Sequence, residues 1–113
     1  MDNLLETVLK AVSERKAEDI RVYDMRDVTP LIDEMVIAST SNVRQNNAVV
    51  QNLKDRLYEN GYEGDFRVEG SKESRWILVD LGDIVVNLFV DDERDVYGLD
   101  RLYADVPWQA YDL

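Results

Sequence analysis

The 113-residue chain contains no cysteine and no histidine. Without cysteine it has no disulfide framework, no thiolate zinc site and no thiol nucleophile. Without histidine it lacks the commonest metal ligand and the usual general base, which excludes a serine nucleophile activated by histidine. Carboxylates are therefore the only abundant reactive side chains.

Glycine and long apolar runs are also scarce. The five glycines form no glycine-rich phosphate loop. No apolar run approaches the ~20 residues needed to span a bilayer. The stretch from Met1 to Glu6 has neither a basic leader nor a long apolar region, so we expect no signal peptide. The length and these absences favour a cytoplasmic protein with one domain, residues 1–113.

Positive charge is in short supply. Thirteen lysines and arginines oppose 24 aspartates and glutamates, which gives a formal net charge of −11 at pH 7. Such a chain repels nucleic-acid phosphate, and we expect it to attract basic partners. An acidic surface that only keeps the protein soluble is the plainer interpretation, and it fits most acidic proteins.

Hydrophobic patterning predicts a mixture of helices and strands. Apolar stripes predict two helices, one over residues 2–16 and one from the cap Ser41 to Asn60-Gly61. Apolar runs and alternation predict five strands, at residues 19–24, 34–39, 66–69, 76–81 and 84–90. A last short helix is predicted at residues 96–104, before Pro107. The long helix between the second and third strands allows a crossover, so we expect an α/β or α+β domain with a five-stranded mixed sheet flanked by helices.

The stretch from Trp76 to Val90 contains two strongly apolar runs, residues 76–81 and 84–90. They flank Gly82-Asp83, a typical turn pair, which predicts a hairpin. Runs that are apolar on both faces are typical of the middle of a sheet, so we place this hairpin at the centre of the fold. Asn87 is the polar exception in its second strand, and it is either hydrogen-bonded within the sheet or directed at a partner.

Acidic residues stand at or near the ends of these strands, at Asp80, Asp83, Asp91 and Asp92. Two such carboxylates could bind a divalent metal for phosphoryl or nucleotidyl transfer. That chemistry also needs a cradle of backbone N–H groups for the triphosphate, usually in a glycine-rich loop. Because the loop is missing, acids in turns and facing solvent are the preferred explanation. We expect no metal, no cofactor and no catalytic residue.

The segment after the hairpin combines acids with aromatic rings. Residues 91–113 contain seven acids and two arginines, a net charge of −5, and four of the ten aromatic residues lie between Tyr97 and Tyr111. Rings beside charges are typical of protein interfaces, because rings bury much area at a low entropic cost. Composition equally allows Tyr97, Tyr103 and Trp108 to cap the core instead.

Residues 76–105 carry a recognisable pattern. The run Trp76-Ile-Leu-Val-Asp80-Leu-Gly82-Asp83-Ile-Val-Val-Asn87-Leu-Phe89, followed by Arg94 and Tyr97-x-Leu99-Asp100-x-Leu102-Tyr103-Ala-Asp105, resembles the ribosomal silencing factor family, also called the Iojap family. The likeness extends over essentially the whole chain, through Lys16-Ala17-Glu-Asp19-Ile20 with Asp24, Val36-Ile37-Ala38-Ser39-x-Ser41 with Arg44-Gln45, and Glu69-Gly70. The family usually has His, Glu and Trp where Asn87, Asp100 and Tyr103 stand.

The resemblance implies a fold similar to nucleotidyltransferases without their catalytic motifs. It implies binding to the large ribosomal subunit through the ribosomal protein numbered fourteen, at the face where the subunits join. A protein docked there blocks the small subunit sterically and represses translation, typically when nutrients are short. Homodimers are also seen in the family. The net negative charge then suits a basic ribosomal protein, with little direct contact to RNA.

The resemblance also suggests where the partner binds. The predicted contact residues lie on the hairpin and on the segment after it: Trp76, Leu78, Asp80, Arg94, Tyr97, Leu99, Asp100, Leu102 and Tyr103. Strand residues are expected to form a flat apolar platform, the rings and leucines after them to pack or insert, and Asp80 and Asp100 to meet Lys or Arg. Some of these residues, Trp76 above all, are also explained as core. Two other functions stay open, a metal-dependent nucleotidyl-transfer enzyme and a dimeric protein adaptor.

Overall fold

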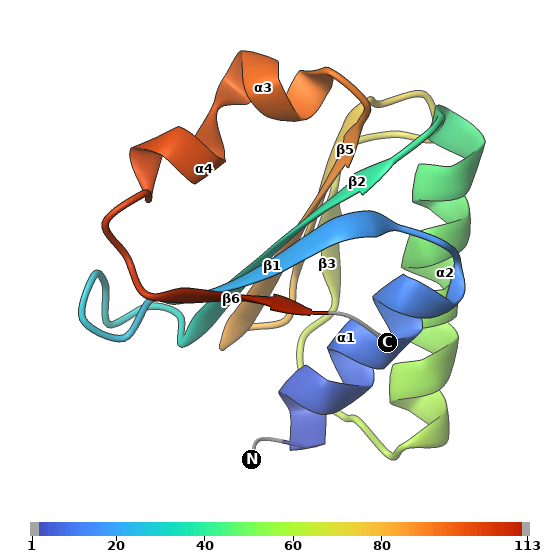
Figure 1. Cartoon of the computed structure of the whole chain (residues 1–113). Coiled ribbons are helices and arrows are strands. Elements are labelled where there is room, and N and C mark those ends of the chain that lie inside the picture. Colours follow the sequence, from blue (N-terminus) through green and yellow to red (C-terminus); the bar gives the residue numbers. More distant parts are fainter. Residues whose placement is uncertain (1–2, 112–113) are drawn as a thin grey trace.

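The protein is described by a computed structural model that covers residues 3–111 (Figure 1). In chain order the elements are α1 (Asn3–Glu14), β1 (Glu18–Asp24), β2 (Glu34–Thr40), α2 (Val43–Glu59), β3 (Arg67–Glu69), β4 (Trp76–Asp80), β5 (Ile84–Val90), α3 (Glu93–Tyr97), α4 (Leu99–Leu102) and β6 (Trp108–Tyr111). The first residue of the predicted N-terminal helix, at position 2, lies outside the described residues.

The strands form one mixed sheet in the order β3-β4-β5-β2-β1-β6. β2 and β5 run parallel in the middle, and the other neighbouring pairs are antiparallel. A parallel pair needs a long crossover, which α2 and the two strands after it provide. The predicted mixed α/β sheet is therefore confirmed.

The sheet has six strands, so the prediction of five is wrong. The additional strand is β6, which pairs with β1 so that Trp108 lies opposite Tyr23. It has four residues, and three of them are exposed, so it has no buried alternation that a sequence pattern could reveal. Its conformation is fixed by a partner strand that lies far away in the chain.

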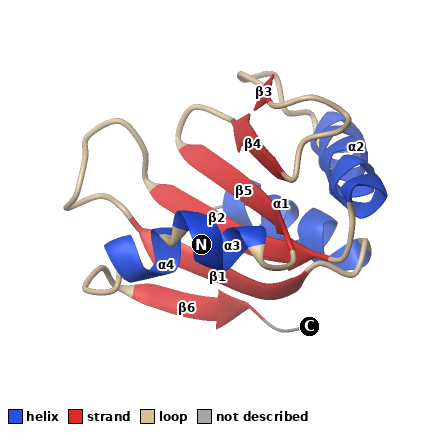
Figure 2. Ribbon diagram, turned by 90° about the horizontal axis from the view of Figure 1, so that it is seen from above, coloured by secondary structure: helices blue, strands red, loops and turns tan. Residues whose placement is uncertain are grey.

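α1 and α2 pack on one side of the sheet, and α3 and α4 lie on the other (Figures 1 and 2). We call the first the closed side and the second the open side. The closed side holds the larger core, to which α1 contributes Val8 and Val12 and α2 contributes Val49 and Leu53, all fully buried. Their spacing of four residues places them on one face of each helix. None of the helices within residues 3–111 is long and apolar enough to cross a membrane.

The hairpin of β4 and β5 lies only partly at the centre. β5 is buried at all positions except Val85, and β2 is buried at all except Ser39, so these two strands form the middle of the sheet. β4 lies one strand from the edge, and its residues alternate between buried and half-buried. The predicted central hairpin is therefore corrected to a central parallel pair, β2 and β5, with β4 beside it.

The helices differ from the prediction at three points, the first of which is that α1 ends at Glu14 rather than at residue 16. The cap of α2 is Asn42 rather than Ser41, because the Asn42 side chain accepts a hydrogen bond from the Gln45 N–H at 2.8 Å. The single helix predicted at residues 96–104 is wrong, since α3 ends at Gly98 and α4 starts directly after it. Gly98 has a φ of 66°, and its N–H donates to the Arg94 carbonyl, a typical helix stop.

Candidate partner-binding surface

The predicted residues on β4 all face the open side. Trp76, Leu78 and Asp80 are half-buried, whereas Ile77 and Val79 between them are buried in the closed-side core. Side chains of a strand point alternately to its two faces, which produces this separation. β3 and β4 extend beyond the area that α3 and α4 cover (Figure 2), which agrees with the partial exposure of Trp76, Leu78 and Asp80.

Trp76 connects β4 with β5 and α3. Its ring stacks on Phe89 with centroids 5.0 Å apart and lies 4.4 Å from the Tyr97 ring. Its indole N–H donates to Asn87 Oδ1 at 2.9 Å. Asn87 is therefore hydrogen-bonded within the sheet. Trp76 packs against Phe89 and is also partly exposed on the open side. With Leu78 it lines a shallow pocket of about 230 Å³.

The segment α3–α4 divides its apolar residues between the interior and the surface. Leu99 and Tyr103 pack against the open-side core, which consists of Tyr23, Met25, Met35, Ile37 and Phe89. Val96, Tyr97 and Leu102 remain exposed, with 71%, 51% and 70% of their surfaces accessible. The capping interpretation therefore applies to Tyr103, which packs against the core, whereas Tyr97 is half exposed and its role in an interface stays a prediction.

Arg94 is a buried charge that joins α3 to the sheet. Only 6% of its surface is accessible. Its guanidinium donates to both carboxylate oxygens of Asp100, at 2.7 and 3.3 Å. The remaining Nη1 donates to the Asp19 carbonyl at 2.6 Å and to Ser39 Oγ at 2.9 Å. Such a fork-like pairing of guanidinium with carboxylate satisfies most of the donors that burial removes from water.

Asp100 has a second partner in β1. The Tyr23 O–H donates to Asp100 Oδ1 at 2.5 Å, and an Arg21 nitrogen lies 3.8 Å from the same oxygen. Burial alone would raise the pKa of Asp100, but hydrogen bonds from Arg94 and Tyr23 outweigh it and hold the pKa below its ordinary value. Burial and the nearby carboxylate raise the pKa of Tyr23. The Asp100 carboxylate thus forms ion pairs with arginines of its own chain.

Asp80 is engaged in the hairpin turn. Its Oδ1 accepts the Gly82 N–H at 2.8 Å, and its Oδ2 lies 3.3 Å from an Arg67 nitrogen. This local bonding agrees with the interpretation of Asp80 as a turn acid. Across residues 3–111, no group of three or more His, Cys, Asp or Glu side chains is arranged to hold a metal ion.

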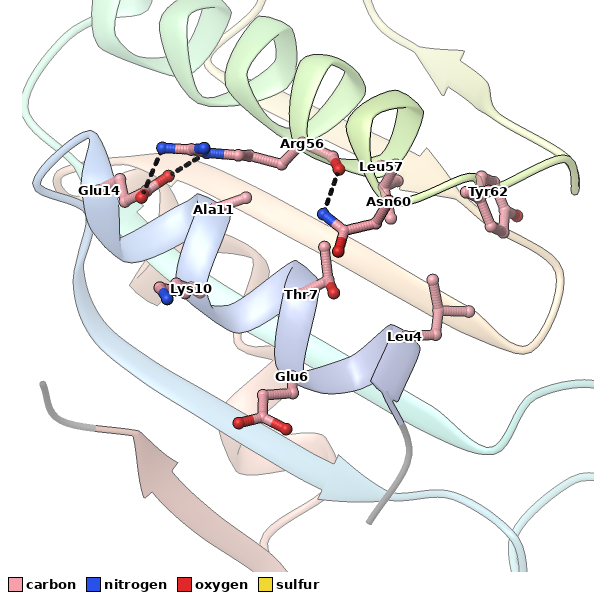
Figure 3. Close-up of a pocket in the computed structure, with 10 residues that line it drawn as sticks. All are labelled: Leu4, Glu6, Thr7, Lys10, Ala11, Glu14, Arg56, Leu57, Asn60 and Tyr62. Atoms are coloured by element: carbon pink, nitrogen blue, oxygen red, sulfur yellow. Dashed lines mark hydrogen bonds and ion pairs between the residues drawn. The ribbon is translucent and has the colours of Figure 1, made fainter.

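A larger hollow, of about 570 Å³, lies on the closed side between α1 and the end of α2 (Figure 3). Its charged groups already bind one another, since Arg56 donates to the two carboxylate oxygens of Glu14 at 2.8 and 2.9 Å. Asn60 in turn donates to the Arg56 carbonyl at 2.7 Å. The hollow therefore presents paired polar groups, in contrast to the exposed apolar residues of the open side.

Comparison with known proteins decides the family. Residues 1–113 match the family described as "Ribosomal silencing factor during starvation". The chain belongs to the ribosomal silencing factor family. A protein of Bacillus subtilis (strain 168) named ribosomal silencing factor RsfS is 37% identical over 105 residues, which cover 93% of this chain and 88% of that protein. The resemblance predicted from the sequence is confirmed.

Solved structures agree with this fold for a silencing factor. A crystal structure of a protein from Bacillus halodurans has a TM-score of 0.78 at 33% identity and covers 97% of both chains. A crystal structure of a protein from Chromobacterium violaceum has a TM-score of 0.83 at 30% identity, over 92% of this chain and 88% of that one. Both similarities support the mixed sheet with its flanking helices.

In this silencing factor the nine predicted residues fall into three groups. Tyr97 and Leu102 are exposed, Arg94 is buried, and the others are half-buried: Trp76, Leu78, Asp80, Leu99, Asp100 and Tyr103. Sequence reasoning missed Val96, whose exposure follows from its place on the solvent side of α3. It also missed Tyr23 and Ser39 as partners of the charged groups. The alternation of Arg21 and Tyr23 in β1 was the available signal, because it places both on one face of the sheet.

Proposed function

We propose that this silencing factor represses translation by docking its open side on the ribosomal protein numbered fourteen of the large subunit. Family membership supports the coarser statement, a ribosome-associated regulator of translation, and relatives are named as silencing factors rather than as enzymes. The docked protein then occupies the face where the subunits join and obstructs the small subunit. The cytoplasm, where ribosomes work, is the expected location.

The exposed apolar residues of α3 and α4 carry this proposal. Val96, Tyr97 and Leu102 are each at least half accessible, although the segment is short and lies beside a fully buried core. An apolar surface of this kind costs free energy in water and marks a site for a partner. Tyr97 adjoins Trp76, so the apolar surface continues from the exposed Tyr97 to the half-buried Trp76 and Leu78 of β4.

Charge indicates the chemistry of the partner. Asp91, Asp92, Asp95 and Asp105 are exposed on the same segment. Exposed acids on the same segment as exposed apolar residues fit a basic protein, for which the charges speed association and set the register. Ribosomal RNA is the less suitable partner, because a chain of net charge −11 repels phosphate.

The size of the protein explains how docking obstructs the small subunit. A standard interface buries about 800 Å² on each partner. The whole chain exposes 6938 Å², so most of the surface would remain outside such an interface. The molecule measures 32 × 32 × 26 Å. A body of these dimensions would keep the two subunits apart where it sits between them.

Co-sedimentation with isolated large subunits tests the proposal. Tyr97→Ala removes an exposed ring, and we expect about 30-fold weaker binding, equivalent to about 2 kcal/mol. The matched control is Tyr58→Ala, since Tyr58 is an 83% exposed tyrosine on α2 and should not affect binding. Addition of the unaltered protein should also lower the yield of joined ribosomes from purified subunits, and Tyr97→Ala should restore it.

Three results would overturn the proposal. The unaltered protein fails to sediment with large subunits, it binds them without reducing subunit joining, or Tyr58→Ala and Tyr97→Ala weaken binding equally. Self-association of the purified protein without ribosome binding would favour the dimeric adaptor instead. Circular dichroism of each variant tests whether its fold is intact.

A further inference from the structure

We infer that Arg94, Asp100 and Tyr23 are positioning residues, which hold α3 and α4 in the pose that presents Tyr97 and Leu102 to the partner. We call these three residues the clamp. The inference rests on the proposed function, because it assigns roles within the same surface. It removes Arg94 and Asp100 from the predicted contact residues and gives them an indirect role.

The segment needs such a device because its helices are too short to be stable alone. α3 has five residues and α4 has four, and Gly98 separates them. Isolated helices of fewer than ~12 residues are marginal in water. A docking surface on these helices therefore depends on the contacts that attach them to the sheet.

Arg94 makes the attachment of α3. Its guanidinium reaches two strands at once, through the Asp19 carbonyl of β1 and the Ser39 hydroxyl of β2. Asp19 has a φ of 48°, and the pairing of β1 with β2 shifts register between Glu18 and Arg21. A bulge of this kind redirects the groups within it, here bringing a carbonyl oxygen to Arg94. The local irregularity of β1 thus has a role in holding α3.

Asp100 makes the attachment of α4. It accepts hydrogen bonds from Arg94 in α3 and from Tyr23 in β1, so it joins both helices to the sheet. Tyr23 is 1% exposed, and its ring belongs to the open-side core. The charge of Asp100 is balanced within the chain, since Arg94 and Arg21 lie 2.7 and 3.8 Å from its oxygens. A carboxylate balanced in this way adds little to the long-range attraction of a basic partner.

Two kinds of acid are thereby distinguished on one segment. Asp95 is exposed on α3 and should act by charge, so its loss lowers the salt dependence of binding. Asp100 should act through the pose of the helices. Its loss lowers the population of the binding-competent pose and weakens binding by the same factor at every salt concentration.

Asp100→Asn tests the inference, since asparagine keeps the shape but loses the charge. We expect affinity for large subunits to fall about tenfold if the competent pose falls to about a tenth. The slope of log Kd against log salt should stay unchanged, whereas Asp95→Asn should reduce that slope. Hydrogen exchange of the free protein should accelerate at the amides of Gly98, Leu102 and Tyr103, but not in α2. Glu6→Gln removes an exposed acid from α1 and is the control. It should change neither the affinity for large subunits nor the hydrogen exchange of α3 and α4.

Tyr23→Phe is the second, milder variant. It deletes only the hydroxyl that donates to Asp100, and it should change affinity and exchange in the same direction by a smaller factor. The inference is overturned if Asp100→Asn binds as tightly as the unaltered protein, if it lowers the salt slope as Asp95→Asn does, or if exchange in α3 and α4 stays the same. In these cases binding by the unaltered protein still supports the proposed function. If the unaltered protein does not bind, the function and the inference both fail.

Discussion

The two sides of the sheet are stabilised in different ways. On the closed side, helices of 12 and 17 residues bury fully apolar positions such as Val12 and Leu53. On the open side, helices of five and four residues combine a smaller core with the buried charge of Arg94. The closed side depends mainly on apolar area, to which Asn52 adds a buried hydrogen bond from α2 to the Ala11 carbonyl of α1. The open side relies more on directional hydrogen bonds around Arg94, while Val96, Tyr97 and Leu102 stay exposed.

The largest expected effect is on the closed side. Leu53→Ala should lower the free energy of unfolding by about 2–5 kcal/mol, because Leu53 is fully buried and its truncation leaves a cavity. Urea denaturation measures this change. Binding of large subunits, counted per folded molecule, should be unchanged, since the open side is intact. A loss of affinity without a loss of stability would show that the two sides are not independent.

The second largest effect is the loss of the contribution of the clamp to the free energy of unfolding at low pH. The pKa of Asp100 in the folded protein lies below its ordinary value of 3.8, so Asp100 stabilises the fold above that value and loses this contribution as pH falls through the folded pKa. The difference in unfolding free energy between the unaltered protein and Asp100→Asn should thus be constant from pH 7 to about 5. It should narrow below about pH 4. Urea denaturation of both proteins across this pH range measures the difference in unfolding free energy. If that difference stays undiminished down to pH 2, the bonding described for Asp100 is contradicted.

The smallest expected effect on stability is at the exposed surface. Leu102→Ser should change the free energy of unfolding by less than about 0.5 kcal/mol, because 70% of the Leu102 surface already faces water. Its affinity for large subunits should nevertheless fall. Leu99→Ser is the matched variant, since Leu99 packs on the open-side core and its change should destabilise the fold measurably. Equal free energies of unfolding for the two variants would argue against the assignment of Leu99 to the core and of Leu102 to the surface.

The sequence predicted the elements whose stability comes from local patterns. The other five strands, the short and exposed β3 included, and the helix from residue 43 to 59 are confirmed, with boundaries that differ by at most two residues. Apolar periodicity and capping residues report such elements directly. β6 and the break at Gly98 were not predicted, because pairing with β1 decides the first and one left-handed glycine decides the second.

Side-chain partners across the fold were the main feature that the sequence did not reveal. Arg94 and Asp100 are six residues apart and looked like surface charges. Their burial depends on Tyr23 and Ser39, which belong to strands more than fifty residues earlier in the chain. Only the assembled sheet shows that one predicted contact residue is buried and that another is already paired. The exposure of Tyr97 and Leu102 likewise became visible only once the packing of Leu99 and Tyr103 was known.

The parallel pairing of β2 with β5 has a consequence for protein turnover. Ile37 lies opposite Asn87, fifty residues later, and the segments of the open side lie next to this pair or are packed across it. A fragment that stops before β5 therefore has no open side, even if α1 and α2 are complete. Degradation that proceeds from the C-terminal end removes β6 first and then α4 and α3, so it would remove the proposed docking surface before it reaches β5.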